Sequence, residues 1–156
     1  MNINFCNLLD YDNYIIYDNG TVQNKKTKRI LKKSLDTSGY YKVNLYKNGK
    51  RKTFRIHQLV AKHFIPNPML KGYIDHIDQN RLNNNVSNLR YVTNQENCFN
   101  RIETLDTGVC FIESRNKYLA QIGFNGKTIF LGYYDNKSDA IKSRNQAKIK
   151  YHTIKP

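Results

Sequence analysis

Hydrophobic and polar positions alternate along the first third of the chain as they do in short antiparallel strands. Tyr14–Tyr17 and Thr21–Asn24 flank an Asp-Asn-Gly turn, and Val43 and Leu45 share one face of residues 41–46. Asn48-Gly49 is a strong hairpin signal ahead of a further strand at residues 50–56. This pattern predicts a small antiparallel meander with one face rich in Lys, Arg and Tyr.

The period changes to that of a helix at His57, and Pro66 stops this helix. Two short strands are then predicted at residues 73–77 and 89–92, with an Asn-rich loop between them. Thr93–Glu96 reads as a capping box that opens a second helix. The apolar positions of the first helix recur at helical spacing: Leu59, Val60 and Phe64.

The last third of the chain returns to strands, at residues 108–112, 118–124 and 128–133, with Asn125-Gly126 as a second hairpin turn. A helix capped by Asn136 or Ser138 then extends to about Tyr151. We expect its sheet face to hold Ala140, Ile141, Ala147 and Ile149, and its solvent face to hold Lys142, Arg144, Lys148 and Lys150. The predicted fold class is α+β.

The net charge of the chain indicates that the protein binds a polyanion. The 156 residues carry a formal charge of +14, and such self-repulsion is offset when phosphates are neutralised. Residues 1–57 carry a net +8 and residues 101–156 a net +5, whereas residues 58–100 are nearly neutral. We therefore expect two phosphate-binding flanks around a centre with another role.

Cysteines and hydropathy exclude other classes of protein. Cys6, Cys98 and Cys110 are far apart and form no Cys-x-x-Cys pair, which argues against a disulfide framework and against structural zinc. The N-terminal residues lack a basic stretch followed by an apolar run, and no segment reaches the length of a membrane span. We expect an intracellular location, cytoplasmic or with access to the nucleus, and no membrane partner.

One segment, from Tyr73 to Asn97, carries the chemistry. Asp75 and His76 are adjacent in a predicted strand, Asn88 follows twelve residues after His76, and Asn97 nine residues later. Phosphodiester hydrolysis needs a base to deprotonate water and a cation for the charge on the leaving oxygen. The His can act as the base and the adjacent Asp can hold the cation, with Asn97 in the predicted second helix as a second oxygen ligand. Mg²⁺ prefers such a sparse oxygen site.

These residues and the text around them, IHQLVAKHFIPNP and IDHIDQNRLNNNVSNLRYVTNQEN, resemble the HNH homing endonucleases of phages and group I introns. The resemblance implies a ββα-metal finger that hydrolyses DNA. It implies His76 as general base, Asp75 and Asn97 as ligands of one Mg²⁺ or Mn²⁺, and Asn88 as the residue that fixes the loop and His76. His57 and His63 fit packing or hydrogen-bonding roles instead.

A second resemblance covers residues 107–151, which are similar to the AP2 DNA-binding domain, with Tyr118 where Trp is usual. The predicted modules are residues 1–56, a basic DNA-contacting β region; 57–104, the nuclease finger; and 105–156, the AP2-like domain. Residues expected to contact double-stranded DNA are Lys25, Lys26, Lys28, Arg29, Lys50, Arg51, Lys52, Arg55, Arg90, Arg101, Arg115, Lys117, Tyr118 and Lys127.

The predicted function is thus metal-dependent DNA cleavage by a monomer on an extended site. One active site per chain favours a nick. Two alternatives stay open: a catalytically inactive DNA-binding regulator of the AP2 type, and an RNA-binding protein that stacks bases on Tyr. The target sequence and the encoding genome, whether phage, virus or intron, stay open as well.

Overall fold

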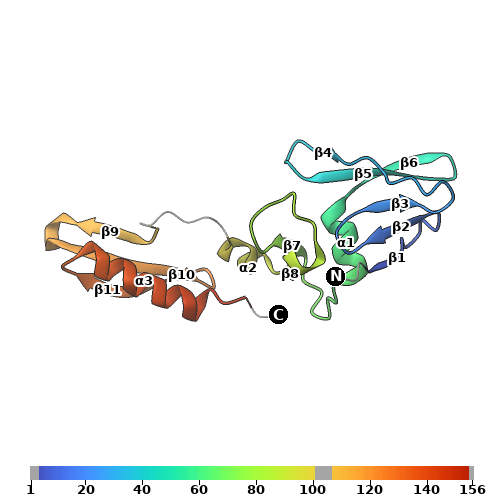
Figure 1. Cartoon of the computed structure of the whole chain (residues 1–156). Helices are drawn as coiled ribbons and strands as arrows, with labels where there is room; N and C mark the ends of the chain where they lie inside the picture. The colour runs from blue at the N-terminus through green and yellow to red at the C-terminus, as the bar shows by residue number, and fades with distance from the viewer. Residues whose placement is uncertain (1–3, 101–106, 155–156) are drawn as a thin grey trace. The chain divides into compact units, whose positions relative to one another are not determined.

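The structure, a computed structural model, describes residues 4–100 and 107–154 (Figure 1). Contacts divide the chain into two compact units, Met1–Thr93 and Asn94–Pro156. The predicted α+β class is confirmed in outline, since each unit combines small antiparallel sheets with helices. The finer division into three modules and the AP2 resemblance of the last one stay predictions.

Two three-stranded antiparallel sheets open the first unit. The predicted Asn48-Gly49 turn joins the strands 41–47 and 50–55. Asn48 and Gly49 have φ angles of 51° and 74°, and Lys47 pairs with Lys50 across the turn. Both sheets follow chain order: β1 (Phe5–Asn7), β2 (Tyr14–Tyr17) and β3 (Val22–Asn24) in one, and β4 (Ser34–Leu35), β5 (Tyr41–Lys47) and β6 (Lys50–Arg55) in the other.

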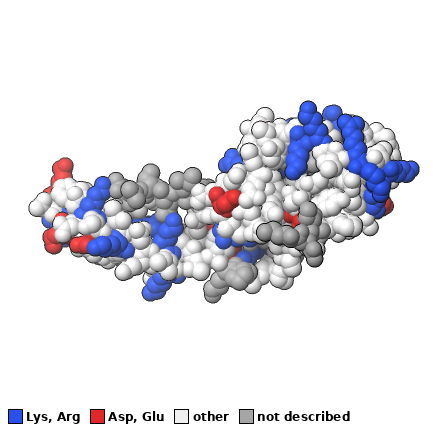
Figure 2. Space-filling view, viewed as in Figure 1, with Lys and Arg blue, Asp and Glu red and all other residues white. Residues whose placement is uncertain are grey.

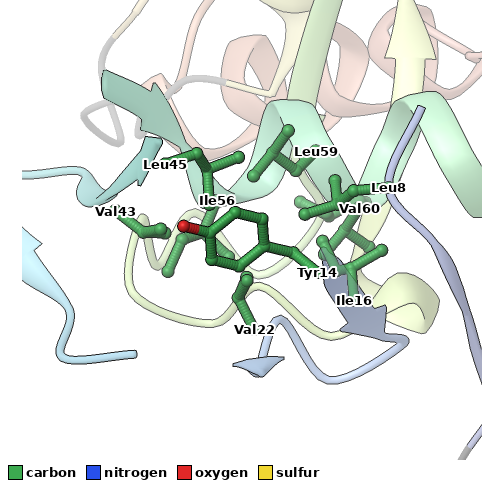
Figure 3. Packing of buried hydrophobic residues seen from close by; sticks show 10 residues of the cluster. Leu8, Tyr14, Ile16, Val22, Val43, Leu45, Ile56, Leu59 and Val60 are labelled. Atoms are coloured by element: carbon green, nitrogen blue, oxygen red, sulfur yellow. The ribbon is translucent and has the colours of Figure 1, made fainter. Parts of the chain in front are cut away.

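Helix α1 (Ile56–Phe64) follows β6 directly and carries the core of the first unit. It ends where predicted, because Ile65 precedes Pro66 and adopts an extended conformation. Figure 3 shows the apolar side chains of α1 packed around the ring of Tyr14 together with side chains from β2, β3 and β5. The fully buried members include Leu8, Ile16, Val22, Val43, Leu45, Ile56 and Val60.

Strands β7 (Tyr73–His76) and β8 (Leu89–Val92) form a separate antiparallel hairpin. Asp75 lies opposite Arg90, and His76 lies opposite Leu89. The long connection between the strands ends in a single 3₁₀ turn, η1 (Val86–Asn88), which is capped by the side chain of Asn85. This hairpin and its loop present the residues of the predicted motif.

The second unit contains helix α2, a three-stranded sheet in the order β11-β10-β9, and helix α3 against one face of that sheet (Figure 1). The small core between sheet and helix is built on Val109, Ala120 and Ala140. The elements are α2 (Asn94–Phe99), β9 (Val109–Ile112), η2 (Glu113–Arg115), β10 (Lys117–Phe124), β11 (Lys127–Tyr134) and α3 (Lys137–Tyr151).

The predicted faces of α3 are wrong at two positions. Arg144 is buried, with 5% of its surface exposed, whereas Ile149 is 77% exposed. Helix geometry gives the reason: at about 100° per residue, position 149 lies about half a turn from Ala140, whereas positions 144 and 147 fall on the side of Ala140. Arg144 packs beside Gly108, where an added Cβ would lie 3.1 Å from the Arg144 Nε atom.

Within the part of the chain that the structure describes, no helix is long and apolar enough to cross a membrane.

Candidate active site

Asp75 and His76 end strand β7, and both side chains are buried. Oδ2 of the Asp75 carboxylate accepts a hydrogen bond from Nε of Arg90 at 2.9 Å and forms an ion pair with Nη2 of Arg90 at 2.8 Å. Because Arg90 is its cross-strand partner, the hairpin itself sets this ion pair. The two residues of the predicted motif thus have fixed and different surroundings.

The imidazole of His76 is held by an amide and two rings. Its Nε2 lies 3.4 Å from Oδ1 of Asn84, whose own Nδ2 donates to the carbonyl of Leu82 at 3.0 Å. An amide oxygen only accepts, so this contact suits the tautomer of His76 that carries its proton on Nε2. Burial lowers the pKa of His76, against smaller raising effects of Asn84, Asp78 and Asp75. A neutral imidazole at neutral pH can accept a proton from water.

Asn88 closes the loop that follows β7. Its Nδ2 donates to Oδ1 of Asp78 at 2.8 Å and to the carbonyl of Asn83 at 2.9 Å, and its Oδ1 accepts from the backbone N–H of Asp78 at 3.0 Å. The N–H of Ile77 also donates to the Asn88 carbonyl at 2.8 Å. These bonds tie the residues just after His76 to the start of β8.

The carboxylate of Asp78 serves this loop as a hydrogen-bond acceptor. The side chain of Asn83 donates to Oδ2 at 2.7 Å, and the N–H of Asn80 donates to Oδ1 at 2.8 Å. The pKa of Asp78 is lowered, first by the Asn83 bond and further by Asn80 and Asn88. Asp78 therefore holds the loop in its ionised form.

Asn97 belongs to α2, in the second unit. Its predicted partnership with Asp75 stays a prediction. Among the described residues there is no cluster of three or more His, Cys, Asp or Glu side chains that could bind a metal ion. Carboxylate and amide oxygens, the donors that these two residues offer, suit one hard divalent ion that keeps several waters.

Two residues that the sequence did not assign to the site lie against His76. The rings of His57 and Tyr40 have centroids 5.2 Å and 5.9 Å from the His76 ring. Burial, together with the nearby charges of His76 and Arg55, lowers the pKa of His57 to about 4, against a raising effect of Asp36. His63 has the structural role expected of it, since its Nε2 accepts from the N–H of Leu9 at 2.9 Å.

The predicted DNA-contacting residues of the first unit are spread over a turn and a strand. Lys25, Lys26, Lys28 and Arg29 follow β3, and Lys50, Arg51 and Lys52 begin β6. Figure 2 shows Lys and Arg side chains gathered over the β4–β6 part of this unit. Two predicted contacts are engaged within the protein: Arg90 with Asp75, and Arg55 with Asp36 at 2.6 Å.

In the second unit, the residues that were predicted to contact DNA have different surroundings. Arg115 lies over the ring of Tyr133, with Cζ 4.8 Å from its centroid, and Lys117 pairs with Asp135 at 3.0 Å. Lys127 is exposed at the start of β11. Tyr118 instead packs against the small core, beside Phe111. Arg101 lies outside the described residues.

Known proteins resemble this chain along much of its length. Residues 54–98 match the family described as HNH endonuclease. DNA endonuclease I-HmuI of Bacillus phage SP01 is 38% identical over 89 residues, which cover 57% of this chain and 51% of that protein. H-N-H endonuclease F-TflII of Escherichia phage T5 is 32% identical over 131 residues, which cover 81% of this chain and 66% of that protein.

A viral relative and a solved structure agree with these matches. An uncharacterized HNH endonuclease of Acanthamoeba polyphaga mimivirus is 39% identical over 93 residues, 60% of this chain and 28% of the relative. A solved structure described as DNA binding and cleavage by the HNH homing endonuclease I-HmuI aligns with a TM-score of 0.59 at 25% identity, and covers 98% of this chain and 93% of that chain.

The hairpin of β7 and β8 and its loop lie within the residues that match the HNH endonuclease family. Residues 54–98 resemble the HNH endonuclease family, and the matches support a DNA-cleaving enzyme. The chain spans from 28% to 66% of the length of the three relatives named above.

Proposed function

We propose that the chain is a metal-dependent DNA endonuclease of the homing type that cuts at the Asp75–His76 site. This proposal rests on two buried side chains at the end of β7, a carboxylate and an imidazole, that have different partners. The Asp75 carboxylate is held by Arg90, and burial lowers the pKa of His76, which keeps its ring neutral at neutral pH. A base and an anionic ligand on adjacent residues fit hydrolysis of a phosphodiester.

In the proposed reaction, the imidazole of His76 takes a proton from water, and the water oxygen attacks phosphorus. The P–O3′ bond breaks, and solvent protonates the leaving O3′, which gives a 5′-phosphate and a 3′-hydroxyl. Asp75 and Asn97 would hold one Mg²⁺ or Mn²⁺. When bound, this ion would stabilise the negative charge on the leaving oxygen. Asn88 keeps the loop after His76 in place through its three side-chain hydrogen bonds.

The second unit is proposed to hold the DNA. The face of its sheet opposite α3 exposes the rings of Phe130 and Tyr133, with the Arg115 guanidinium stacked on Tyr133. Their register partners on β10 are Gln121 and Leu119, which alternate with the buried residues that face the helix. Cationic and aromatic side chains on one open sheet face suit contacts with phosphates and bases.

The inactive DNA-binding alternative is not favoured, because Asp75, His76 and Asn88 all occupy a formed hairpin site and the known relatives are endonucleases. One active site per chain makes a nick the expected product, formed by a monomer.

The proposal is tested by incubating the full chain with supercoiled plasmid at low salt in Mg²⁺, Mn²⁺ or EDTA. We expect open-circle DNA with either metal and none with EDTA. DNA ligase should reseal the nick, since the ends are a 5′-phosphate and a 3′-hydroxyl. Persistent cleavage in EDTA, or ends that ligase cannot join, would contradict the proposed chemistry.

A further inference from the structure

Residues 67–71, which we call the tip loop, lie between α1 and β7 and project from the first unit (Figure 1). The loop carries two apolar side chains: Leu70 is 86% exposed and Met69 is 70% exposed. Among the described residues, no other large hydrophobic side chain is as exposed as Leu70. Burial of such side chains is a main source of stability, and this pair does not contribute to it.

The backbone of the tip loop has a conformation that suits another residue type. Leu70 has a φ of 50°, in the left-handed region. In that region a Cβ atom crowds the following carbonyl oxygen, so Gly or Asn is the usual residue. A leucine at this position is unfavourable both for its backbone and for its exposed side chain. Strain of this kind points to a role other than stability.

The tip loop is closed by the side chain of Asn67. Its Oδ1 accepts the N–H of Lys71 at 2.8 Å, and its Nδ2 donates to the carbonyl of Lys71 at 2.9 Å. The N–H of Leu70 donates to the carbonyl of Asn67 at 3.1 Å. Between these anchors, the ring of Pro68 fixes one further φ angle. The loop therefore presents both apolar side chains on a restrained backbone.

The tip loop is also close to the proposed cleavage site along the chain. Leu70 precedes Asp75 by five residues, and five residues of extended chain span at most about 18 Å. Base pairs of a duplex are about 3.4 Å apart along its axis. DNA held at Asp75 and His76 therefore comes within range of the loop at base pairs up to about five steps from the cut. The positive charge of Lys71, next to Leu70 in the sequence, favours the approach of phosphates.

The size of this apolar surface favours DNA over a protein partner. A stable protein–protein interface buries about 800 Å² on each partner, which is far more than two adjacent side chains offer. Proteins that enter the minor groove, by contrast, insert apolar wedges such as Leu, Met or Phe between neighbouring base pairs. The inserted side chain unstacks that base step and kinks the duplex. Met69 and Leu70 have the chemistry and the exposure that such insertion needs.

We propose that Met69 and Leu70 form a wedge that enters the minor groove near the cut and unstacks one base step. This inference rests on the proposed nuclease function and adds a determinant of sequence specificity to it. Steps of a pyrimidine followed by a purine, such as TA and CA, unstack most easily. The wedge therefore selects target sites that have such a step within about five base pairs of the cut.

The first test measures the unwinding of DNA, because a base step that a side chain opens is also untwisted. The full chain is bound to relaxed closed-circular plasmid in EDTA, and a topoisomerase that needs no metal is added. The linking number is read after the protein is removed. Wild type is compared with Leu70→Asn, Leu70→Met and the control Leu35→Asn at equal occupancy of the DNA.

The variants separate the apolar side chain from the backbone at position 70. Asn tolerates the left-handed conformation and removes the apolar side chain, whereas Met keeps an apolar one. Leu35 is a matched control because it is an exposed leucine of the first unit, on β4. We expect wild type, Leu70→Met and Leu35→Asn to lower the linking number alike. Leu70→Asn should produce roughly half of that change or less, with an unfolding free energy at least equal to that of wild type.

The outcomes separate the two proposals. A wild type that does not nick plasmid with Mg²⁺ refutes the proposed function. A wild type that nicks plasmid but leaves its linking number unchanged in EDTA overturns the wedge alone. Equal unwinding by Leu70→Asn, or an equal loss in Leu70→Met, also overturns it. Self-association that is lost in Leu70→Asn while unwinding stays the same would assign the tip loop to a second copy of the chain instead.

A second measurement reads the sequence preference. Nicks made by the full chain with Mg²⁺ in a library of random duplexes are mapped by sequencing. Wild type should favour a TA, CA or TG step at one position within about five base pairs of the nick. In Leu70→Asn this preference should weaken by about 5-fold or more, while the preferences at other positions stay. Equal preferences at that position in both proteins would overturn the proposal.

Discussion

Replacing Asn88 with alanine removes three hydrogen bonds that close the loop after His76. The bonds join its side chain to Oδ1 of Asp78, the backbone N–H of Asp78 and the carbonyl of Asn83, at 2.8, 3.0 and 2.9 Å. Each such bond contributes about 1 kcal/mol net. Asp78 is exposed, so water can satisfy it after the substitution. We therefore expect Asn88→Ala to lower the free energy of unfolding by about 2 to 3 kcal/mol.

Urea denaturation of the full chain measures this loss. Asn44→Ala is a matched control, because Asn44 is exposed and accepts a single hydrogen bond, from the Thr53 hydroxyl. We expect that control to stay within about 0.5 kcal/mol of wild type. Asn88→Asp should be at least as harmful as Asn88→Ala at neutral pH, since it would set a carboxylate against Asp78. A loss below about 0.5 kcal/mol for Asn88→Ala would refute the reasoning.

Two further predictions concern charge. The pKa of His57 is about 4, below its ordinary 6.5, so the unfolded chain binds a proton that the folded chain does not in that window. The unfolding free energy should therefore fall by about 2 to 3 kcal/mol as pH drops from 6.5 to 4. His57→Phe should make the unfolding free energy less dependent on pH in this range. An equally steep dependence in the variant would contradict the lowered pKa of His57. Separately, replacing Lys50, Arg51 and Lys52 with alanine should reduce the slope of log affinity for DNA against log salt by about 2 to 3; an unchanged slope would show that β6 does not contact phosphates.

Local pattern was enough to predict most elements of the fold. The Asn48-Gly49 turn, the alternation around Val43 and Leu45, and the stop of α1 before Pro66 each follow from neighbouring residues, and the structure has them as expected. Strands β1 and β4 were missed because they are only three and two residues long and show no full alternation. In α3, composition was given more weight than angular position, which misplaced Arg144 and Ile149.

The candidate site was predictable only where its residues are close in sequence. Asp75, His76 and Asn88 stand on one hairpin with motif spacing. Tyr40, just before β5, and His57, in α1, contact His76 only in the packed tertiary structure. Arg90 was expected to contact DNA because of its charge. Its position opposite Asp75 on the neighbouring strand, which lets it pair with that carboxylate, could not be read from the sequence.

The central claim is that His76 is the base of a DNA-cleaving site. The most direct test measures DNA binding and Mg²⁺-dependent plasmid nicking in the same samples for wild type, His76→Ala and the control His63→Gln. The account predicts that His76→Ala binds DNA as wild type does and nicks it at least about 100-fold more slowly, while His63→Gln still nicks. Cleavage by His76→Ala at the wild-type rate, or a wild type that binds and never nicks, would contradict it.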